Sequence, residues 1–212
     1  KIYNSDGGEI SACGNGSRCI AYLLGKKLNL KSVKIKTNNR ILDAEVVGDT
    51  SVKLSMGKPL FNWKEIPLAK ELDSKKVNIE VDGEVYQNGF CLNVGNPHII
   101  FFVKDCFNYD LKNLGPKIEN HNIFPERTNV TFAHINNENL ISVNVWERGA
   151  GLTKACGTAA CATAVAAFKN KLTTNNVNIK FKEGLLNIEI DNDDCIFMTG
   201  PVSTVKDIKI NI

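Results

Sequence analysis

The sequence lacks a long apolar run, a strong excess of one charge, and a regular spacing of metal ligands. Its longest apolar stretch, 159–168, falls short of the roughly 18 residues that a membrane-spanning helix needs. The 26 basic and 23 acidic side chains leave a net charge of +3 with no dense Lys/Arg block, which excludes a dedicated nucleic-acid or anionic-membrane surface. We therefore expect a small-molecule partner, no nucleic acid and no membrane.

Neither a disulfide framework nor a zinc site fits the cysteines. The seven cysteines are odd in number, and a chain of 212 residues does not need disulfides to fold, so we expect reduced thiols. Five residues separate Cys13 from Cys19, and the three histidines are scattered, which is unlike zinc-ligand spacing. We expect no bound metal.

The remaining composition is that of a globular protein. The chain is 43% hydrophobic and 23% charged, and its length suits one domain or two small ones. It begins at Lys1 rather than Met, and a polar segment follows at once. We expect that the natural protein begins upstream.

An internal repeat organises the chain. Residues 12–17 (ACGNGS) recur in reduced form at 155–160 (ACGTAA), and a polar residue, Asn4 or Glu147, precedes the cysteine by nine residues in both copies. An apolar helical stretch, two strand-like runs and a similar closing phrase, 52–59 or 195–201, follow each Cys-Gly pair. This pattern predicts two copies of a β-β-α-β-β-β unit.

The repeat also predicts the domain organisation. A predicted strand pair over 89–103 and a linking segment to residue 140 precede the second copy, so by symmetry about 60 residues would precede Lys1 and the whole protein would have about 270. We expect a truncated N-terminal half at 1–75 and a C-terminal half at 76–202. A final strand at 203–212 would return to the first half.

The helical stretches indicate the fold class. Residues 158–169 are apolar on nearly every side, which predicts a helix buried all round, and short alternating strands flank it. A second helix is predicted over 17–26, with Gly25 as its stop signal. The expected fold is α+β, with two pseudo-symmetric domains that each wrap a curved, mostly antiparallel sheet around a central helix. The first strands of the N-terminal domain are expected to be absent from this chain.

The two Cys-Gly pairs suggest acid–base chemistry. A thiol at a helix N-terminus meets unpaired amides and the positive end of the macrodipole, which favour the thiolate, and Gly14 and Gly157 leave room for a carboxylate near those amides. If the two turns face each other, Cys13 and Cys156 could invert an α-carbon, one removing a proton while the other delivers one to the opposite face. The amides would stabilise the charge that develops on the carboxylate, without a metal or pyridoxal cofactor.

A lone cysteine is more often a small buried hydrophobe than a reactive group. The matched positions of Cys13 and Cys156 favour function for this pair. We interpret the other five cysteines as core residues, two inside the predicted helices and three in or near apolar strand-like runs: Cys19, Cys161, Cys91, Cys106 and Cys195.

Together these motifs resemble those of the diaminopimelate epimerase family. The segments are 4–9 (NSDGGE), 12–19 (ACGNGSRC), 95–98 (GNPH), 125–129 (PERTN), 147–151 (ERGAG) and 155–158 (ACGT), so the resemblance covers nearly the whole chain. It implies a cofactor-independent isomerase of two similar domains that interconverts LL- and meso-diaminopimelate.

The resemblance also implies site residues. Cys13 and Cys156 would be the two catalytic bases, and His98 and Glu147 would be important for catalysis. The substrate-binding set would be Asn4, Gly14, Asn15, Asn96, Asn129, Glu147, Arg148, Gly157 and Thr158. Among these, the Arg148 fork suits the distal carboxylate, and Glu147 can accept from an ammonium group. Each polar motif could also have a purely structural explanation, with Asn96 in a turn, Asn129 as a loop cap and Glu147-Arg148 as a solvated ion pair.

Two alternatives stay open. A proline or hydroxyproline racemase of similar fold also uses a cysteine pair, although the asparagines and the 147–151 segment favour a longer substrate with charges at both ends. A thiol redox protein could close Cys13 and Cys156 reversibly into a disulfide. By resemblance we expect a cytoplasmic homodimer that serves lysine biosynthesis and, in bacteria, cell-wall cross-linking.

Overall fold

The computed structural model describes residues 2–3, 9–10, 14–37 and 41–203. The chain divides into two compact units, Lys1–Ser55 with Thr199–Ile212, and Met56–Met198. The expected halves 1–75 and 76–202 remain a prediction, and almost all of the expected final strand at 203–212 lies outside the described residues.

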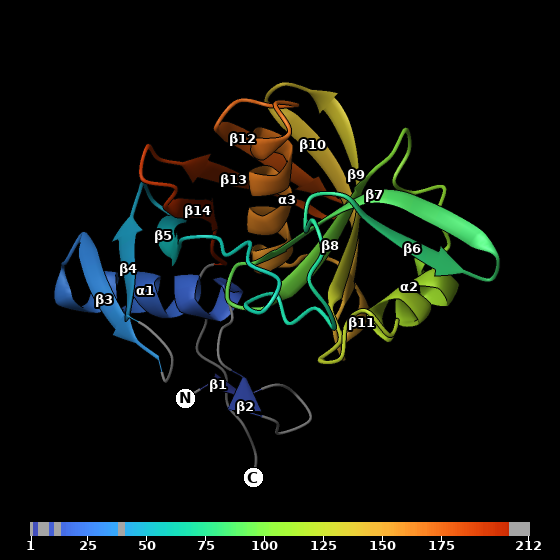
Figure 1. Ribbon diagram of the computed structural model, residues 1–212. Helices are drawn as coiled ribbons and strands as arrows, with labels where there is room; N and C mark the ends of the chain where they lie inside the picture. Colours follow the sequence, from blue (N-terminus) through green and yellow to red (C-terminus); the bar gives the residue numbers. More distant parts are fainter. Residues whose placement is uncertain (1, 4–8, 11–13, 38–40, 204–212) are drawn as a thin grey trace, which may run out of the picture. The chain divides into compact units, whose positions relative to one another are not determined.

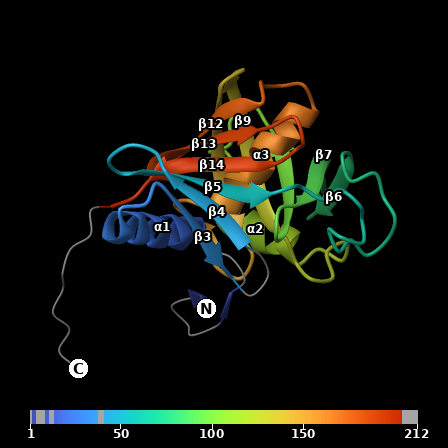
Figure 2. The same cartoon turned by 90° about the vertical axis from the view of Figure 1, so that its left-hand side faces the viewer.

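The first unit combines one helix with short antiparallel strands. Strands β1 (Ile2–Tyr3) and β2 (Glu9–Ile10) pair with each other. Helix α1 (Gly14–Leu28) packs against β3 (Ser32–Lys36) and β4 (Ile41–Val46), as Figure 2 shows, and β5 (Ser51–Gly57) pairs with β4.

Gly25 is not the stop signal of α1. The helix continues to Leu28, and it ends where Asn29 adopts a left-handed backbone (φ 53°) and Leu30 N donates to Gly25 O at 2.9 Å. A Cβ at Gly25 would lie 2.8 Å from Val46 Cγ2, so the glycine allows close packing of α1 on β4. Helix α3 ends in the same way, with Lys171 (φ 57°) followed by a bond from Leu172 N to Ala167 O.

The second unit is built on a large mixed sheet (Figure 1). Its strands lie in the order β14-β13-β12-β10-β9-β8-β7-β6, with β11 paired to β10. The pairs β8·β9 and β10·β12 are parallel, and β6·β7, β7·β8, β9·β10, β10·β11 and β12·β13 are antiparallel. The strand bounds are β6 (Val77–Val81), β7 (Glu84–Asn93), β8 (Pro97–Phe102), β9 (Asn129–Asn137), β10 (Leu140–Glu147), β11 (Gly151–Thr153), β12 (Asn176–Phe181), β13 (Gly184–Ile190) and β14 (Ile196–Pro201), the last of which begins in this unit.

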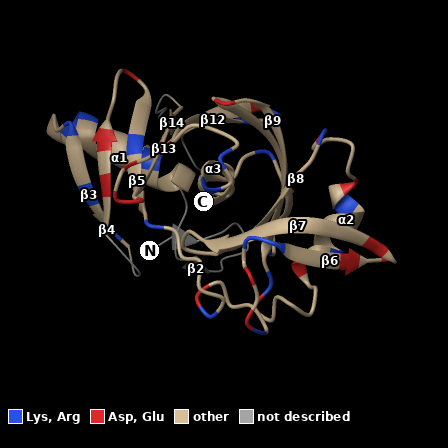
Figure 3. Ribbon diagram, turned by 45° about the horizontal axis from the view of Figure 1, so that its top comes forward, with Lys and Arg blue, Asp and Glu red and all other residues tan. Residues whose placement is uncertain are grey.

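Helix α3 (Gly157–Lys169) is the centre of this unit. Figure 3 shows α3 end-on, with β7, β8, β9 and β12 curving around it. Because strands contact it on several sides, only small side chains fit, and the run of alanines in 159–167 is fully buried. The predicted α+β class and the curved, mostly antiparallel sheet around a central helix are confirmed.

A second layer covers the opposite face of the sheet. Alternate residues of β8 and β9, such as Ile99 and Phe132, point into a core closed by helix α2 (Leu111–Glu119). Helix α2 lies in the region that was expected to be only a linking segment, and the sequence does not predict it because Gly115 and Pro116 in its middle are poor helix formers. Asp110 caps the helix by accepting from Lys112 N at 3.2 Å.

The internal repeat is confirmed at the level of element order. The series β1-β2-α1-β3-β4-β5 recurs as β10-β11-α3-β12-β13-β14. None of the helices among the described residues is both long enough and apolar enough to cross a bilayer.

Candidate active site

The second Cys-Gly pair forms the start of α3. Cys156 has an extended backbone (φ −139°, ψ 114°), and its carbonyl accepts the first helical hydrogen bond, from Ala160 N at 3.0 Å. The Cys156 residue is 5% exposed, and its Sγ lies 3.4 Å from Thr158 Oγ1. Gly157 is the first residue of the helix, where backbone amides lack intrahelical partners. This end of α3 therefore suits binding of an anionic group.

The surroundings of Cys156 correct one expectation. A helix N-terminus was expected to favour the thiolate, but burial raises the pKa of the Cys156 thiol, and the charge and hydrogen bond of the Glu147 carboxylate raise this pKa further. Thr158 and the Ala159 amide act in the opposite direction and are outweighed. Cys156 is therefore a protonated thiol that can act as an acid.

Glu147 and Arg148 lie on the turn that joins β10 to β11. Glu147 pairs with Gly151 across the two strands, and Ala150 N donates to Glu147 O at 3.1 Å. Gly149 and Gly151 have φ values of 74° and 84°, a conformation that favours glycine. The ERGAG segment is thus a tight turn that places the Glu147 carboxylate beside Cys156.

His98 is a fully buried, neutral ring on β8. Its Nε2 lies 2.9 Å from Asn96 Oδ1, and its Nδ1 has no hydrogen-bond partner within the described part of the chain. Burial, and to a lesser extent the nearby Arg148 charge, lower the pKa of His98 to about 3. Asn96, His98 and Arg148 are therefore neighbours.

Asn129 occupies the start of β9, beside His98 in the parallel β8·β9 pair. Its side chain forms two hydrogen bonds to the backbone: Nδ2 donates to Pro97 O at 2.7 Å, and Oδ1 accepts from Arg148 N at 3.0 Å. Asn129 is also 2% exposed. It links the β7–β8 turn to the turn that carries Arg148.

Of the predicted site residues in the first unit, the structure describes only Gly14 and Asn15. Gly14 begins α1, and exposed Asn15 accepts from Arg18 Nη2 at 2.8 Å through its Oδ1. Asn4 and Cys13 lie outside the described residues. The structure thus connects Asn96, His98, Asn129, Glu147, Arg148, Cys156 and Thr158 within the second unit, and the expected partnership with the first unit remains a prediction.

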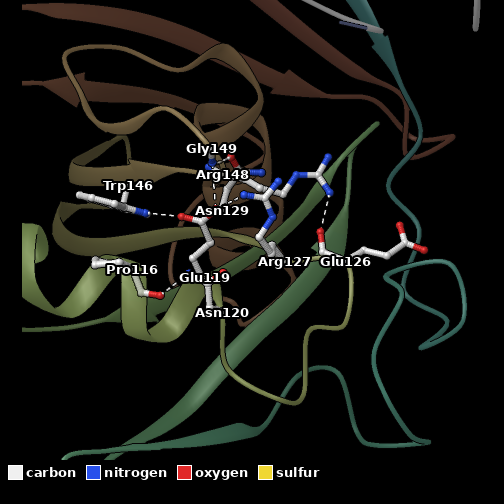
Figure 4. A network of polar contacts seen from close by, with 9 residues as sticks. All are labelled: Pro116, Glu119, Asn120, Glu126, Arg127, Asn129, Trp146, Arg148 and Gly149. Atoms are coloured by element: carbon white, nitrogen blue, oxygen red, sulfur yellow. Dashed lines mark hydrogen bonds and ion pairs between the residues drawn. The ribbon is translucent and has the colours of Figure 1, made fainter. Parts of the chain in front are cut away.

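Glu119, the last residue of α2, is a site residue that no sequence motif predicted. Figure 4 shows its carboxylate among Trp146, Arg127 and Gly149. A signal was available, since the buried residues of α2 are Leu111, Leu114, Gly115, Ile118 and Glu119. This spacing is that of an apolar helix face, and an acid on such a face has a specific partner more often than not.

The other cysteines fit the structural interpretation only in part. Cys91, Cys106 and Cys161 are buried as expected. Cys19 is exposed on α1 and Cys195 is only partly buried, so the expectation that these two belong to the core was wrong. Within residues 14–37 and 41–203, no group of three His, Cys, Asp or Glu side chains is close enough to hold a metal ion.

The sequence is similar to those of known diaminopimelate epimerases. The family model described as "Diaminopimelate epimerase" matches residues 90–205. The chain is 51% identical to a diaminopimelate epimerase of Pelagibacter ubique, over 100% of this chain and 78% of that protein. It is 44% identical to one of Rhodopseudomonas palustris, over 94% of this chain and 70% of that protein.

Solved structures support the fold. A hydroxyproline epimerase from Agrobacterium vitis with bound trans-4-hydroxy-L-proline aligns with a TM-score of 0.62 at 10% identity, over 90% of this chain and 65% of that one. A PhzF-family phenazine biosynthesis protein of Bacillus anthracis aligns with a TM-score of 0.59 at 17% identity, over 97% of this chain and 78% of that one. Fold, matching motifs and sequence identity agree, and the chain belongs to the diaminopimelate epimerase family.

Proposed function

We propose that this chain is a cofactor-independent epimerase that interconverts LL- and meso-diaminopimelate through two cysteines. The observation that carries the proposal is the Cys156-Gly157 start of α3, with the Glu147 carboxylate beside the thiol. The 51% identity to a named diaminopimelate epimerase supports the choice of substrate.

In the proposed reaction Cys156 and Cys13 stand on opposite faces of the reacting α-carbon. Since the Cys156 thiol is protonated, it donates its proton in one direction, while the Cys13 thiolate removes the α-proton from the other face. The roles exchange for the opposite isomer. The amides of Gly157 and Thr158, with those of Gly14 and Asn15, bind the α-carboxylate and stabilise the charge it gains as the proton leaves.

Glu147 has two tasks in this scheme. It accepts a hydrogen bond from the Cys156 thiol, which retains the acidic proton until reaction, and it offers a carboxylate to the α-ammonium group of the substrate. His98 cannot supply a positive charge near neutral pH because its pKa is about 3. We therefore assign His98 a role as a neutral hydrogen-bonding group that orients the substrate amine.

The distal end of the substrate carries a second carboxylate and ammonium. Arg148 supplies the planar donor fork for that carboxylate, and Asn4, Asn96 and Asn129 complete the distal site. Asn129 already bonds the Arg148 backbone and the Pro97 carbonyl, so its main contribution is to place Arg148.

The alternatives are weaker. The hydroxyproline epimerase from Agrobacterium vitis shares the fold at only 10% identity, and this similarity is no evidence that the two proteins share a substrate. A redox role would require Cys156 to form a disulfide readily, whereas a raised pKa makes its thiol slow in exchange. We also propose a cytoplasmic homodimer that serves lysine biosynthesis.

Incubation of the purified protein with LL-diaminopimelate in deuterated water tests the substrate. We expect deuterium at the α-carbon and a mixture of LL and meso isomers by mass spectrometry and chiral chromatography. L-proline and trans-4-hydroxy-L-proline serve as comparison substrates and should remain unlabelled. Labelling of either proline with none of diaminopimelate would replace the proposal by the racemase alternative.

A further inference from the structure

The carboxylate of Glu119 holds both sides of the dipeptide Glu147-Arg148. Its Oε2 accepts from Trp146 Nε1 at 2.6 Å, immediately before the dipeptide, and its Oε1 accepts from Gly149 N at 2.9 Å, immediately after it. One side chain on α2 thus fixes both flanks of the turn, as Figure 4 shows. The two residues between these flanks bind other groups: Glu147 interacts with the Cys156 thiol, and Arg148 Nη1 donates to the Glu126 carbonyl at 3.0 Å.

The burial of Glu119 indicates that this arrangement is specific. Glu119 is 4% exposed, and a buried carboxylate is costly unless it is paired and hydrogen-bonded. Arg127 supplies the opposite charge, with Nη1 3.3 Å from Oε1. Charge-assisted hydrogen bonds of this kind are stronger and more directional than neutral ones.

A second residue of α2, Gly115, packs closely against the indole of Trp146. A Cβ added to Gly115 would lie 2.5 Å from both Cγ and Cδ2 of Trp146, so only glycine leaves room for the ring at this distance. Packing and hydrogen bonding therefore fix Trp146 together, and with it the backbone that leads into Glu147.

We infer that Glu119 is a positioning residue of the active site, which acts through the 146–149 turn to aim Glu147 at the Cys156 thiol and Arg148 at the substrate. The effect on turnover rests on the proposed function, whereas the effect on the turn does not. Glu119 touches no reacting atom in this scheme, and α2 becomes part of the catalytic apparatus through one carboxylate.

Steady-state kinetics with diaminopimelate tests the catalytic part. Glu119→Ala should lower kcat/KM about 10- to 100-fold, with a higher KM because Arg148 loses its aim and a lower kcat because Glu147 does. Glu119→Gln should recover part of this loss, since an amide oxygen can still accept one of the two hydrogen bonds. The exposed Glu71→Ala serves as a matched control and should leave both constants unchanged. A lower kcat with an unaltered KM, as a smaller folded fraction would give, contradicts the inference.

A double-mutant cycle with Arg148→Ala separates positioning from general destabilisation. If Glu119 acts through the turn, Glu119→Ala should not raise KM further in the Arg148→Ala background, while its loss of kcat through Glu147 persists. Fully additive changes in KM would overturn the inference. Gly115→Ala, which leaves the carboxylate intact but displaces Trp146, should reproduce the rise in KM.

Hydrogen exchange provides a readout that needs no activity. In Glu119→Ala the backbone amides of 147–151 should exchange faster, by about tenfold or more, while those of α3 keep their protection. Unchanged exchange at 147–151 would overturn the inference even if the enzyme turns over diaminopimelate. Conversely, an inactive wild type refutes the proposed function, and the exchange result still decides whether Glu119 holds the turn.

Discussion

Helices α1 and α3 both begin at the glycine of a Cys-Gly pair but lie in different surroundings. Strands β7, β8, β9, β12 and β13 all contact α3, and ten of its residues are buried. Helix α1 contacts β3 and β4, four of its residues are buried, and Ile20, Leu23 and Leu24 are 48%, 41% and 38% exposed. The repeated motif therefore specifies a helix start, but it does not by itself specify how deeply the helix is buried.

The difference comes from chain outside the repeated unit. Strands β7, β8 and β9, which complete the wrapping of α3, precede the second copy and are not part of its β-β-α-β-β-β series. The same strands bring His98 and Asn129 to the turn that carries Arg148. Non-repeated sequence thus turns a common helix start into a buried, hydrogen-bonded site.

The largest effect is expected when the cysteine at either helix start is replaced singly. Cys156→Ala and Cys13→Ala should each reduce epimerisation by at least about 1,000-fold, because each removes an acid or base from one face of the α-carbon. The exposed Cys19→Ala is the matched control and should retain wild-type kcat. Substantial turnover by either Cys156→Ala or Cys13→Ala would refute the two-cysteine assignment.

A second prediction compares the stability contributions of the two helices. Val165→Ala on α3 should lower the free energy of unfolding by about 2 kcal/mol, since Val165 is fully buried and a cavity remains. Leu24→Ala on α1 removes more carbon atoms but should lower it by less than about 1 kcal/mol, because Leu24 is partly exposed. Urea titration measures both, and equal losses would contradict the difference in burial.

The neutral, buried His98 predicts a pH dependence of stability. Its pKa is lowered to about 3 in the fold from 6.5, so the unfolded chain binds the extra proton and stability is lost as pH falls below 6.5. Between pH 7 and pH 5.5 this effect should remove about 1 kcal/mol from the free energy of unfolding.

A variant that cannot titrate isolates this effect. His98→Gln should abolish that part of the pH dependence, whereas Phe101→Leu on the same strand should lower stability at every pH and leave the slope unchanged. An unchanged slope in His98→Gln would show that another group is responsible.

The smallest expected effect concerns thiol reactivity. Iodoacetamide should modify the buried, protonated Cys156 more slowly than the exposed Cys19, as followed by mass spectrometry of each peptide. Glu147→Gln should accelerate modification of Cys156 several-fold, because it removes a carboxylate that raises the thiol pKa. Glu71→Gln, a matched change on the surface, should have no effect, and slower modification in Glu147→Gln would contradict the assigned contact.

Much of the fold follows from the sequence because repetition and periodicity are local signals. The recurrence of ACG predicted both helices, and the two strand-like runs that follow each of them are β3 and β4 in the first copy and β12 and β13 in the second. Helix α2 was missed since its Gly and Pro lower helix propensity, whereas Asp110 and the packing of its apolar face stabilise it. The position of Gly25 inside α1 was also unpredictable, because it depends on contact with Val46.

The identities of the site residues could be predicted from the sequence, but their burial and contacts could not. Sequence spacing singled out Cys156, and family motifs supplied Glu147, Arg148 and His98. The protonation of Cys156 depends on burial and on a carboxylate nine residues earlier, so helix position alone gave the wrong direction of the pKa shift. The role of Glu119 depends on three donors from distant segments, which no local pattern displays.

The central claim, that two cysteines act from opposite faces, is tested most directly by the fate of the α-proton in a single turnover. LL-diaminopimelate is converted in deuterated water, and the first meso product is isolated before the reverse reaction begins. Two bases predict that this product carries deuterium at the inverted carbon while the remaining substrate retains its proton. Product that keeps the original proton would mean that one base returns it, which would contradict the account.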